Sequence, residues 1–515
     1  MSDSSNPIEK KIKTASYLLM ASVLISRVIG FFREWVLAQT LGASKLTDVY
    51  YASFTVPDFL NYLMAAGALS ISFIPVLSDY LASDREAEGK RVFRFISTVL
   101  VGMLLTAVIV AEIFAAHLGE WIAPGFDAEQ RQTLTQLLRI ILPAQLFFLW
   151  GGLAISVQQT HGKFIYYALA PIIYNSCIIV CGIVLEPVLG ISSFSVGVLI
   201  GAILGHGVLQ WWGIHRLGYS CLPLFHPTPE LKSALRRYFV LSLPIMLGLS
   251  LVATDEWISK YFASFLEGPA VSWLNYARTS VRVPIAVIGQ VAGVVSFPYL
   301  ARLWAAKQYE DFAGILFREI SKLWFLTILA TLIFYFHALP IIHFLFGGGR
   351  LTSVDLAFTA EGAKWMALAL FFWTSQVLLA RAFYACKITW LPSLIGTLLS
   401  FCFIPIYKIL MDRFGFTGLA MAGSFGVMTY ALLLAIFLKR QLKKVSLNFR
   451  LGAAAGFLTK SSAILILSGV LVWASAQSGL YHGDRMSALW QILLACAAGG
   501  VPAFLLQKLF KRPLF

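Results

Sequence analysis

The sequence has few charged residues, cysteines and histidines for its length. Charged residues make up 13% of its 515 positions, against about 25% in typical soluble proteins. Hydrophobic residues make up 59%. These proportions exclude an ordinary soluble enzyme, because most side chains must face lipid or other apolar helices.

The residues that usually form catalytic or metal centres are also scarce. The six cysteines are scattered, and the one-turn spacing of Cys177 and Cys181 in an apolar stretch favours a packing role. His337 and His343 share no face with a carboxylate at metal-ligand spacing. The glycine-rich turn 347–350 lacks the context of a phosphate-binding loop, and no GxSxG arrangement occurs. We therefore expect no enzymatic activity, no metal and no cofactor.

What the sequence does contain is long apolar runs. About fourteen are long enough to cross a bilayer as helices. We therefore predict an all-α integral membrane protein with about fourteen transmembrane helices. The runs fall at approximately 15–41, 48–78, 94–117, 135–158, 164–186, 191–215, 237–265, 270–300, 316–345, 360–386, 389–410, 416–438, 455–476 and 487–509.

Lysine and arginine are distributed unevenly among the loops. One alternating set of loops carries about 25 of them and the other about six, and positive loops are retained in the cytoplasm. Both termini are thus predicted to be cytoplasmic. The net charge of +15 predicts contact with anionic membrane lipid and not with nucleic acid. The polar segment Met1 to Lys13 has no cleavable signal, so we expect the first span to be retained.

A weak internal repeat divides the chain into two pseudo-symmetric lobes. The second predicted span runs from Tyr51-Ala52 to Phe73-Ile74-Pro75, and the eighth from Tyr276-Ala277 to Ser296-Phe297-Pro298. We predict two lobes of about six helices each, followed by two C-terminal helices. The predicted parts are a cytoplasmic N-terminal segment 1–14, an N-lobe 15–217, a cytoplasmic amphipathic linker 218–236, a C-lobe 237–440 and C-terminal helices 441–515.

The first two apolar runs contain charged candidates for a functional site. Arg27 lies midway along the first run, where a lone arginine costs roughly 2.5–3.5 kcal/mol in lipid and so normally faces protein or water. Pairing with Glu34 on a similar face is one explanation. However, Arg33 lies about 120° around the helix, and one carboxylate cannot easily neutralise both arginines. With Asp48 in the second run, these residues favour an anion site inside the membrane.

The seventh and eighth runs contain a second cluster. Arg278 and Arg282 are one turn apart on a stripe of small and polar residues. Asp255 is a candidate partner for either arginine, whereas the i, i+4 spacing of Glu256 and Lys260 favours their mutual neutralisation. If the lobes face each other, the arginines form a hydrated cationic chamber. Separate salt bridges between helices are the alternative.

Several segments together form a recognisable signature that covers nearly the whole chain. They are Ser26-Arg27-Val28-Ile29-Gly30-Phe31, Arg33-Glu34, Thr47-Asp48, Pro57, Gly67-Ala68, Phe73-Ile74-Pro75, Phe262 to Leu266, Val271-Ser272-Trp273, Tyr276-Ala277 and Arg381 to Ala385 with Lys387 and Pro392. This signature resembles that of the MurJ (MviN) lipid II flippases. The resemblance implies the two-lobed fold of the multidrug/oligosaccharidyl-lipid/polysaccharide exporter superfamily, alternating access, and a place in the bacterial cytoplasmic membrane. It also implies lipid II as substrate, an undecaprenyl diphosphate carrying the peptidoglycan disaccharide-pentapeptide.

Some positions depart from the family's pattern. Asn61, Tyr62 and Ala66 stand where the family usually has Arg and Glu, and Arg278-Thr279 stands where it usually has Asp-Arg. Residues of a sodium site found in some members are replaced here by Thr397, Ser400 and Tyr407, which disfavours sodium coupling. The predicted substrate-binding residues are Arg27, Arg33, Asp48, Arg278, Arg282, Ser26, Glu34, Asn61 and Asp255.

We expect the arginines to bind the diphosphate, because moving phosphate charges and sugars through hydrocarbon unaided is prohibitive. A flippase for another polyprenyl-diphosphate glycan, such as an exopolysaccharide or O-antigen unit, is the nearest alternative. A membrane scaffold that recruits cell-wall synthesis or division proteins is another. The excess of arginine disfavours a cation-drug antiporter, and the lack of an aspartate-rich or metal-binding loop disfavours a glycosyltransferase.

Overall fold

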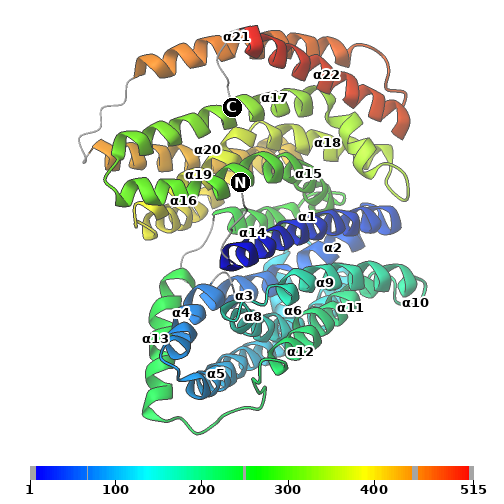
Figure 1. Cartoon of the computed structure of the whole chain (residues 1–515). Coiled ribbons are helices and arrows are strands. Elements are labelled where there is room, and N and C mark those ends of the chain that lie inside the picture. The colour runs from blue at the N-terminus through cyan, green and yellow to red at the C-terminus, as the bar shows by residue number, and fades with distance from the viewer. Residues whose placement is uncertain (1–6, 66–67, 247–250, 444–450, 510–515) are drawn as a thin grey trace. The chain divides into compact units, whose positions relative to one another are not determined.

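The computed structural model describes residues 7–65, 68–246, 251–443 and 451–509. These residues are helical apart from short connections, and they contain no strand. The chain forms two compact units, Met1–Leu247 and Gly248–Phe515 (Figure 1). The prediction of an all-α membrane protein is confirmed.

The helices of the first unit follow one another with short breaks. They are α1 (Pro7–Leu41), α2 (Lys45–Ser53), α3 (Thr55–Ala65), α4 (Ala68–Ala82), α5 (Glu86–Ile113), α6 (Ala115–Ile122), α7 (Ala128–Ile141), α8 (Ala144–Thr160), α9 (Ile165–Val184), α10 (Glu186–Leu189), α11 (Ser192–Gly201), the π-helix η1 (Ala202–Val208), α12 (Leu209–His215) and α13 (Pro229–Met246).

The second unit contains several longer helices. They are α14 (Leu251–Ala263), α15 (Ala270–Pro284), the π-helix η2 (Ile285–Gln290), α16 (Val291–Ala305), α17 (Tyr309–Phe346), α18 (Ser353–Ala367), α19 (Leu370–Ala385), α20 (Trp390–Lys443), α21 (Leu451–Ala476) and α22 (Arg485–Leu509).

Several predicted spans are interrupted helices. Among the described residues, six helical segments are long and apolar enough to cross a membrane, or seven if α18 and α19, bent by 48°, form one span. The total of fourteen therefore stays a prediction. The predicted span 48–78 is divided into α2, α3 and α4, and the span 270–300 into α15, η2 and α16. The spans 389–410 and 416–438 are joined in α20, whose Gly415 breaks the helix with φ 58°, a conformation that glycine adopts without steric cost.

The division between the units falls after α13. This helix runs through the predicted boundary 236/237 and packs against α4, with Leu231 and Tyr238 buried. Arg237 also pairs with Asp79 of α4 at 2.5 Å. The predicted linker thus begins as a loop and ends as part of a helix of the first unit. The arrangement of six, six and two helices stays a prediction.

The first helix begins earlier than predicted. The predicted N-terminal segment 1–14 is helical from Pro7, so α1 begins before the predicted span at 15. The predictions for positions 1–6, for Ala66 and Gly67, and for the basic residues within 444–450 and 510–515 concern positions outside the described residues.

Glycines bring α9 and α11 into close contact. A Cβ added at Gly197 would lie 2.7 Å from Ile178 Cα, and one added at Gly201 would lie 2.8 Å from the Tyr174 carbonyl oxygen. Small residues allow such backbone approach between membrane helices. Because α9 also packs against α1, these contacts fix α9 beside the helix that carries Arg33.

A buried polar network joins α17 to the last two helices. His337 Nε2 lies 3.1 Å from the Val472 carbonyl oxygen and 3.0 Å from Ser475 Oγ. Gln491 Nε2 donates to the Ser475 carbonyl at 2.6 Å. Since a carbonyl oxygen only accepts, Nε2 of His337 carries a hydrogen. This network attaches α21 and α22 to the rest of the second unit.

Candidate functional site

Arg33 lies in a polar cluster formed by α1, α2 and α9. Its Nη2 lies 2.6 Å from Glu34 Oε1, and its Nη1 donates to Asn175 Oδ1 at 3.1 Å. The Tyr51 hydroxyl donates to the other oxygen of Glu34 at 2.9 Å. Three helices therefore orient one guanidinium group in the first unit.

A third nitrogen of the Arg33 guanidinium, Nε, also carries a hydrogen. It is buried and has no hydrogen-bond partner among the described residues. Leaving a buried donor without an acceptor costs about 1–3 kcal/mol. A guanidinium in this state can still form a charge-assisted hydrogen bond to an anion.

The other predicted residues of the first unit lie on α1, α2 and α3. Ser26 is half-buried and Arg27 is exposed on α1, and Asn61 is half-buried on α3. Asp48 is buried in the first turn of α2, where the positive end of the helix favours a carboxylate. Among the predicted residues of this unit, Arg33 and Glu34 are in direct contact.

In the second unit, Arg278 and Asp255 form a buried ion pair. Arg278 Nη2 lies 2.8 Å from Asp255 Oδ2, and both side chains are more than nine-tenths buried. The same nitrogen donates to Ser259 Oγ at 3.1 Å. The Tyr407 hydroxyl donates to the other oxygen of Asp255. The sequence left Asp255 with two candidate partners, and the structure pairs it with Arg278.

Arg282 forms a more exposed ion pair with Glu256 of α14. The side chain of Arg282 is 52% exposed and that of Glu256 is 25% exposed. The neutralisation of Glu256 by Lys260, which the i, i+4 spacing favours, stays a prediction. Arg33, Arg278 and Arg282 thus each pair with a carboxylate of their own unit. Separate salt bridges of this kind are the alternative to a cationic chamber. The chamber itself stays a prediction.

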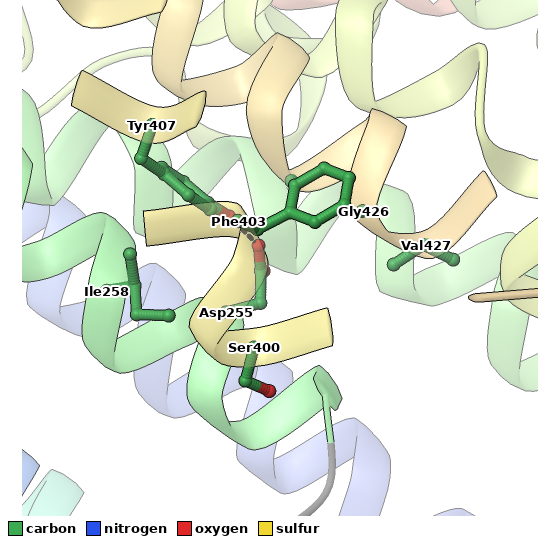
Figure 2. Close-up of a pocket in the computed structure, with 8 residues that line it drawn as sticks. Asp255, Ile258, Ser400, Phe403, Tyr407, Gly426 and Val427 are labelled. Atoms are coloured by element: carbon green, nitrogen blue, oxygen red, sulfur yellow. Dashed lines mark hydrogen bonds between the residues drawn. The ribbon is translucent and has the colours of Figure 1, made fainter. Parts of the chain in front are cut away.

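A small cavity lies beside the buried ion pair (Figure 2). Its volume is about 10 Å³, close to that of one water-sized sphere. Gly423 is needed at its edge, since a Cβ there would lie 2.7 Å from Asp255 Oδ1. The lining residues are Asp255, Ile258, Ser400, Phe403, Tyr407, Gly423, Gly426 and Val427.

The residues around this cavity do not fit a sodium ion. Asp255 is the one carboxylate that lines it, and the Arg278 guanidinium lies 2.8 Å from that carboxylate. Its other oxygen accepts from Tyr407. A fixed positive charge at this distance repels a second cation. We therefore assign no step to sodium.

Sequence reasoning missed four residues that orient the charged groups: Tyr51, Asn175, Ser259 and the Tyr407 hydroxyl as a donor. Asn175 had a usable signal, because it is a lone amide within the apolar helix α9. Tyr407 was noted only as a replacement in the family pattern. Its contact with Asp255 joins residues 152 positions apart, which no local spacing indicates.

Comparison with known proteins assigns the sequence to a family. The model of the family described as lipid II flippase MurJ matches residues 37–494. The chain belongs to this family. It is 28% identical over 432 residues to a protein named probable lipid II flippase MurJ from Vibrio cholerae, with 81% of each chain covered.

Solved structures share the fold. A lipid II flippase MurJ in an inward closed conformation matches with a TM-score of 0.78 and 23% identity, over 96% of this chain and all of that one. An inward-facing multidrug resistance MATE family transporter of the MOP superfamily matches with a TM-score of 0.67 and 13% identity, over 83% of this chain and 99% of that one. These matches confirm the predicted fold. The family match begins after Arg27 and Arg33, so it does not include the part of α1 that carries these two arginines.

Replacing Arg278 with alanine should destabilise the protein strongly. Removing one partner of a buried ion pair costs about 3–5 kcal/mol, because the other charge is left buried. Thermal unfolding of the purified protein in detergent measures the effect. The double variant Arg278→Ala/Asp255→Ala should recover part of the loss. Arg282→Ala is the matched control, since an exposed pair contributes about 0–1 kcal/mol. Equal losses for Arg278→Ala and Arg282→Ala would contradict the structure.

Proposed function

We propose that this protein moves lipid II from the cytoplasmic to the outer leaflet of the bacterial inner membrane by alternating access, with both termini in the cytoplasm. Membership of the MurJ family carries the proposal. The charge asymmetry of the loops supports the orientation. The positive charges of the arginines match the two negative charges of the lipid's diphosphate.

Guanidinium groups bind the diphosphate. Guanidinium matches phosphate oxygens with paired donors and is always charged. Arg33 offers its buried Nε, which lacks a protein acceptor among the described residues. Arg282 offers a half-exposed group. The carboxylates of Glu34 and Glu256 hold these arginines in position, and the phosphates compete with them when substrate enters.

The sugar and peptide headgroup stays in a hydrated cavity while the prenyl tail remains in lipid. Without such a path, desolvation of the phosphates and sugars prevents crossing. Alternating access then exposes the bound diphosphate first to one side of the membrane and then to the other. This step involves no covalent chemistry, in keeping with a transporter.

Reconstituted transbilayer movement tests the proposal. The purified protein is placed in vesicles containing lipid II or, separately, an undecaprenyl-diphosphate exopolysaccharide or O-antigen unit. We expect movement of lipid II at a rate well above that in protein-free vesicles, and rescue of bacteria depleted of their lipid II flippase. Movement of the other glycans with lipid II left behind would identify a different flippase. No movement of any of them, with rescue that depends on the cytoplasmic loops alone, would favour the scaffold.

A further inference from the structure

The connection between α12 and α13 is held against α5 by its backbone. Arg94 Nε donates to the Leu222 carbonyl at 2.9 Å, and Arg94 Nη2 donates to the Pro223 carbonyl at 3.3 Å. The Leu224 N–H donates to Thr98 Oγ1 at 2.9 Å. Figure 1 shows this connection as the green stretch of chain below α5. A loop with three such bonds has a defined position.

These bonds place the connection where the apolar part of α5 begins. Arg94 is the last charged residue before an uncharged run that extends from 95 to 111. The chain then returns to the start of α5, where Glu230 pairs with Arg85 at 2.8 Å. Arg94 lies nine positions after Arg85, a helical rise of about 14 Å. The connection therefore reaches from the charged end of α5 to its lipid boundary.

Two large apolar side chains of this connection are exposed. Leu222 is 68% exposed and Phe225 is 73% exposed. Where α12 ends, just before this connection, the Arg216 guanidinium lies 4.1 Å from the ring centroid of Trp212, which is also exposed. Aromatic rings and positive side chains together are typical of the membrane–water interface, where anionic headgroups attract the charge.

We propose that residues 221–226 form a membrane anchor. Leu222 and Phe225 insert into the acyl boundary of the leaflet on the side of the basic loops, and Arg216 binds anionic phospholipid headgroups. The occupant of this surface is thus an anionic lipid leaflet. The anchor fixes the start of α13, the helix that leads from the first unit to the second, at the membrane surface. This inference does not depend on which lipid is transported.

Depth-dependent quenching tests the anchor. A fluorophore is attached to Phe225→Cys in a full-length, cysteine-free variant in vesicles of phosphatidylethanolamine and phosphatidylglycerol containing a lipid spin-labelled near the headgroup. Ser83→Cys, an exposed position before α5, is the matched control. We expect quenching at least about threefold stronger at 225 than at 83, as insertion requires. Equal quenching at both positions would overturn the proposal.

Two further measurements test the role of Arg94 and the role of the anionic lipid separately. Arg94→Gln removes both bonds to the connection and should lower quenching at 225 toward the control, whereas Arg91→Gln, one turn earlier on α5, should leave it unchanged. Equal effects of the two variants would refute the role of Arg94. Replacing phosphatidylglycerol with phosphatidylcholine should weaken the quenching. A signal from 225 that changes when the protein is diluted in lipid would indicate contact with a second copy and overturn the lipid assignment.

Discussion

Arg282→Ala should abolish transport of lipid II while leaving a folded protein in the membrane. The ion pair between Arg282 and Glu256 is partly exposed, so its loss changes stability by only about 0–1 kcal/mol. A lost charge-assisted hydrogen bond to phosphate costs about 1.5–3 kcal/mol. Complementation of bacteria depleted of their lipid II flippase, with protein abundance measured in the same cells, checks the result.

Glu256→Gln is the matched control for Arg282→Ala. It removes the charge of the partner and keeps the guanidinium, so transport should persist. Arg282→Lys keeps the charge without the paired donors and should transport slowly. Full complementation by Arg282→Ala would show that this arginine is structural.

Arg33→Ala and Arg27→Ala should give the same loss of function. Arg33 is oriented by Glu34 and Asn175, so Asn175→Leu should weaken transport less than Arg33→Ala, because the charge remains. Full complementation by all three arginine variants would favour a scaffold over a transporter.

Collapse of the membrane potential should stop outward movement of lipid II. With the inside negative, each negative charge moved outward gains roughly 2.3 kcal/mol per 100 mV, and two charges gain about 4–5 kcal/mol. The residues beside Asp255 do not fit a sodium ion, so we propose that the membrane potential drives transport. Vesicles with a potassium gradient and valinomycin, in sodium-free buffer, provide the measurement.

The control holds the pH equal on both sides of the membrane with concentrated buffer, while the potassium gradient and valinomycin maintain the membrane potential. Outward accumulation should persist under that treatment and disappear when the potential is removed. Unchanged accumulation in depolarised vesicles, or accumulation restored by sodium alone, would refute potential-driven transport.

The sequence predicted the elements that depend on local pattern. The apolar run at 164–186 corresponds closely to α9, which spans Ile165–Val184. The pairing of Asp255 with Arg278 was one of two sequence candidates. These predictions worked because hydrophobic length and the rarity of charges in lipid constrain each segment separately.

The remaining features depend on distant parts of the chain. The break between α2, α3 and α4 within one apolar run has no strong local signal. Asn175 meets Arg33 across 142 positions of sequence. Glu256 pairs with Arg282 because α14 and α15 pack together, a contact between helices that sequence spacing does not indicate. Such contacts are set by tertiary packing, so residue periodicity alone does not indicate them.

The central claim is that the arginines hold the diphosphate of the lipid. Equilibrium binding of a short-chain lipid II analogue to the purified protein in nanodiscs tests it most directly, with Arg33→Gln and Arg282→Gln beside wild type and Glu256→Gln as the control. Each arginine variant should bind about tenfold to a hundredfold more weakly, as expected for a lost charged hydrogen bond, and the control should bind at least as tightly as wild type. Wild-type affinity in both arginine variants would contradict the claim.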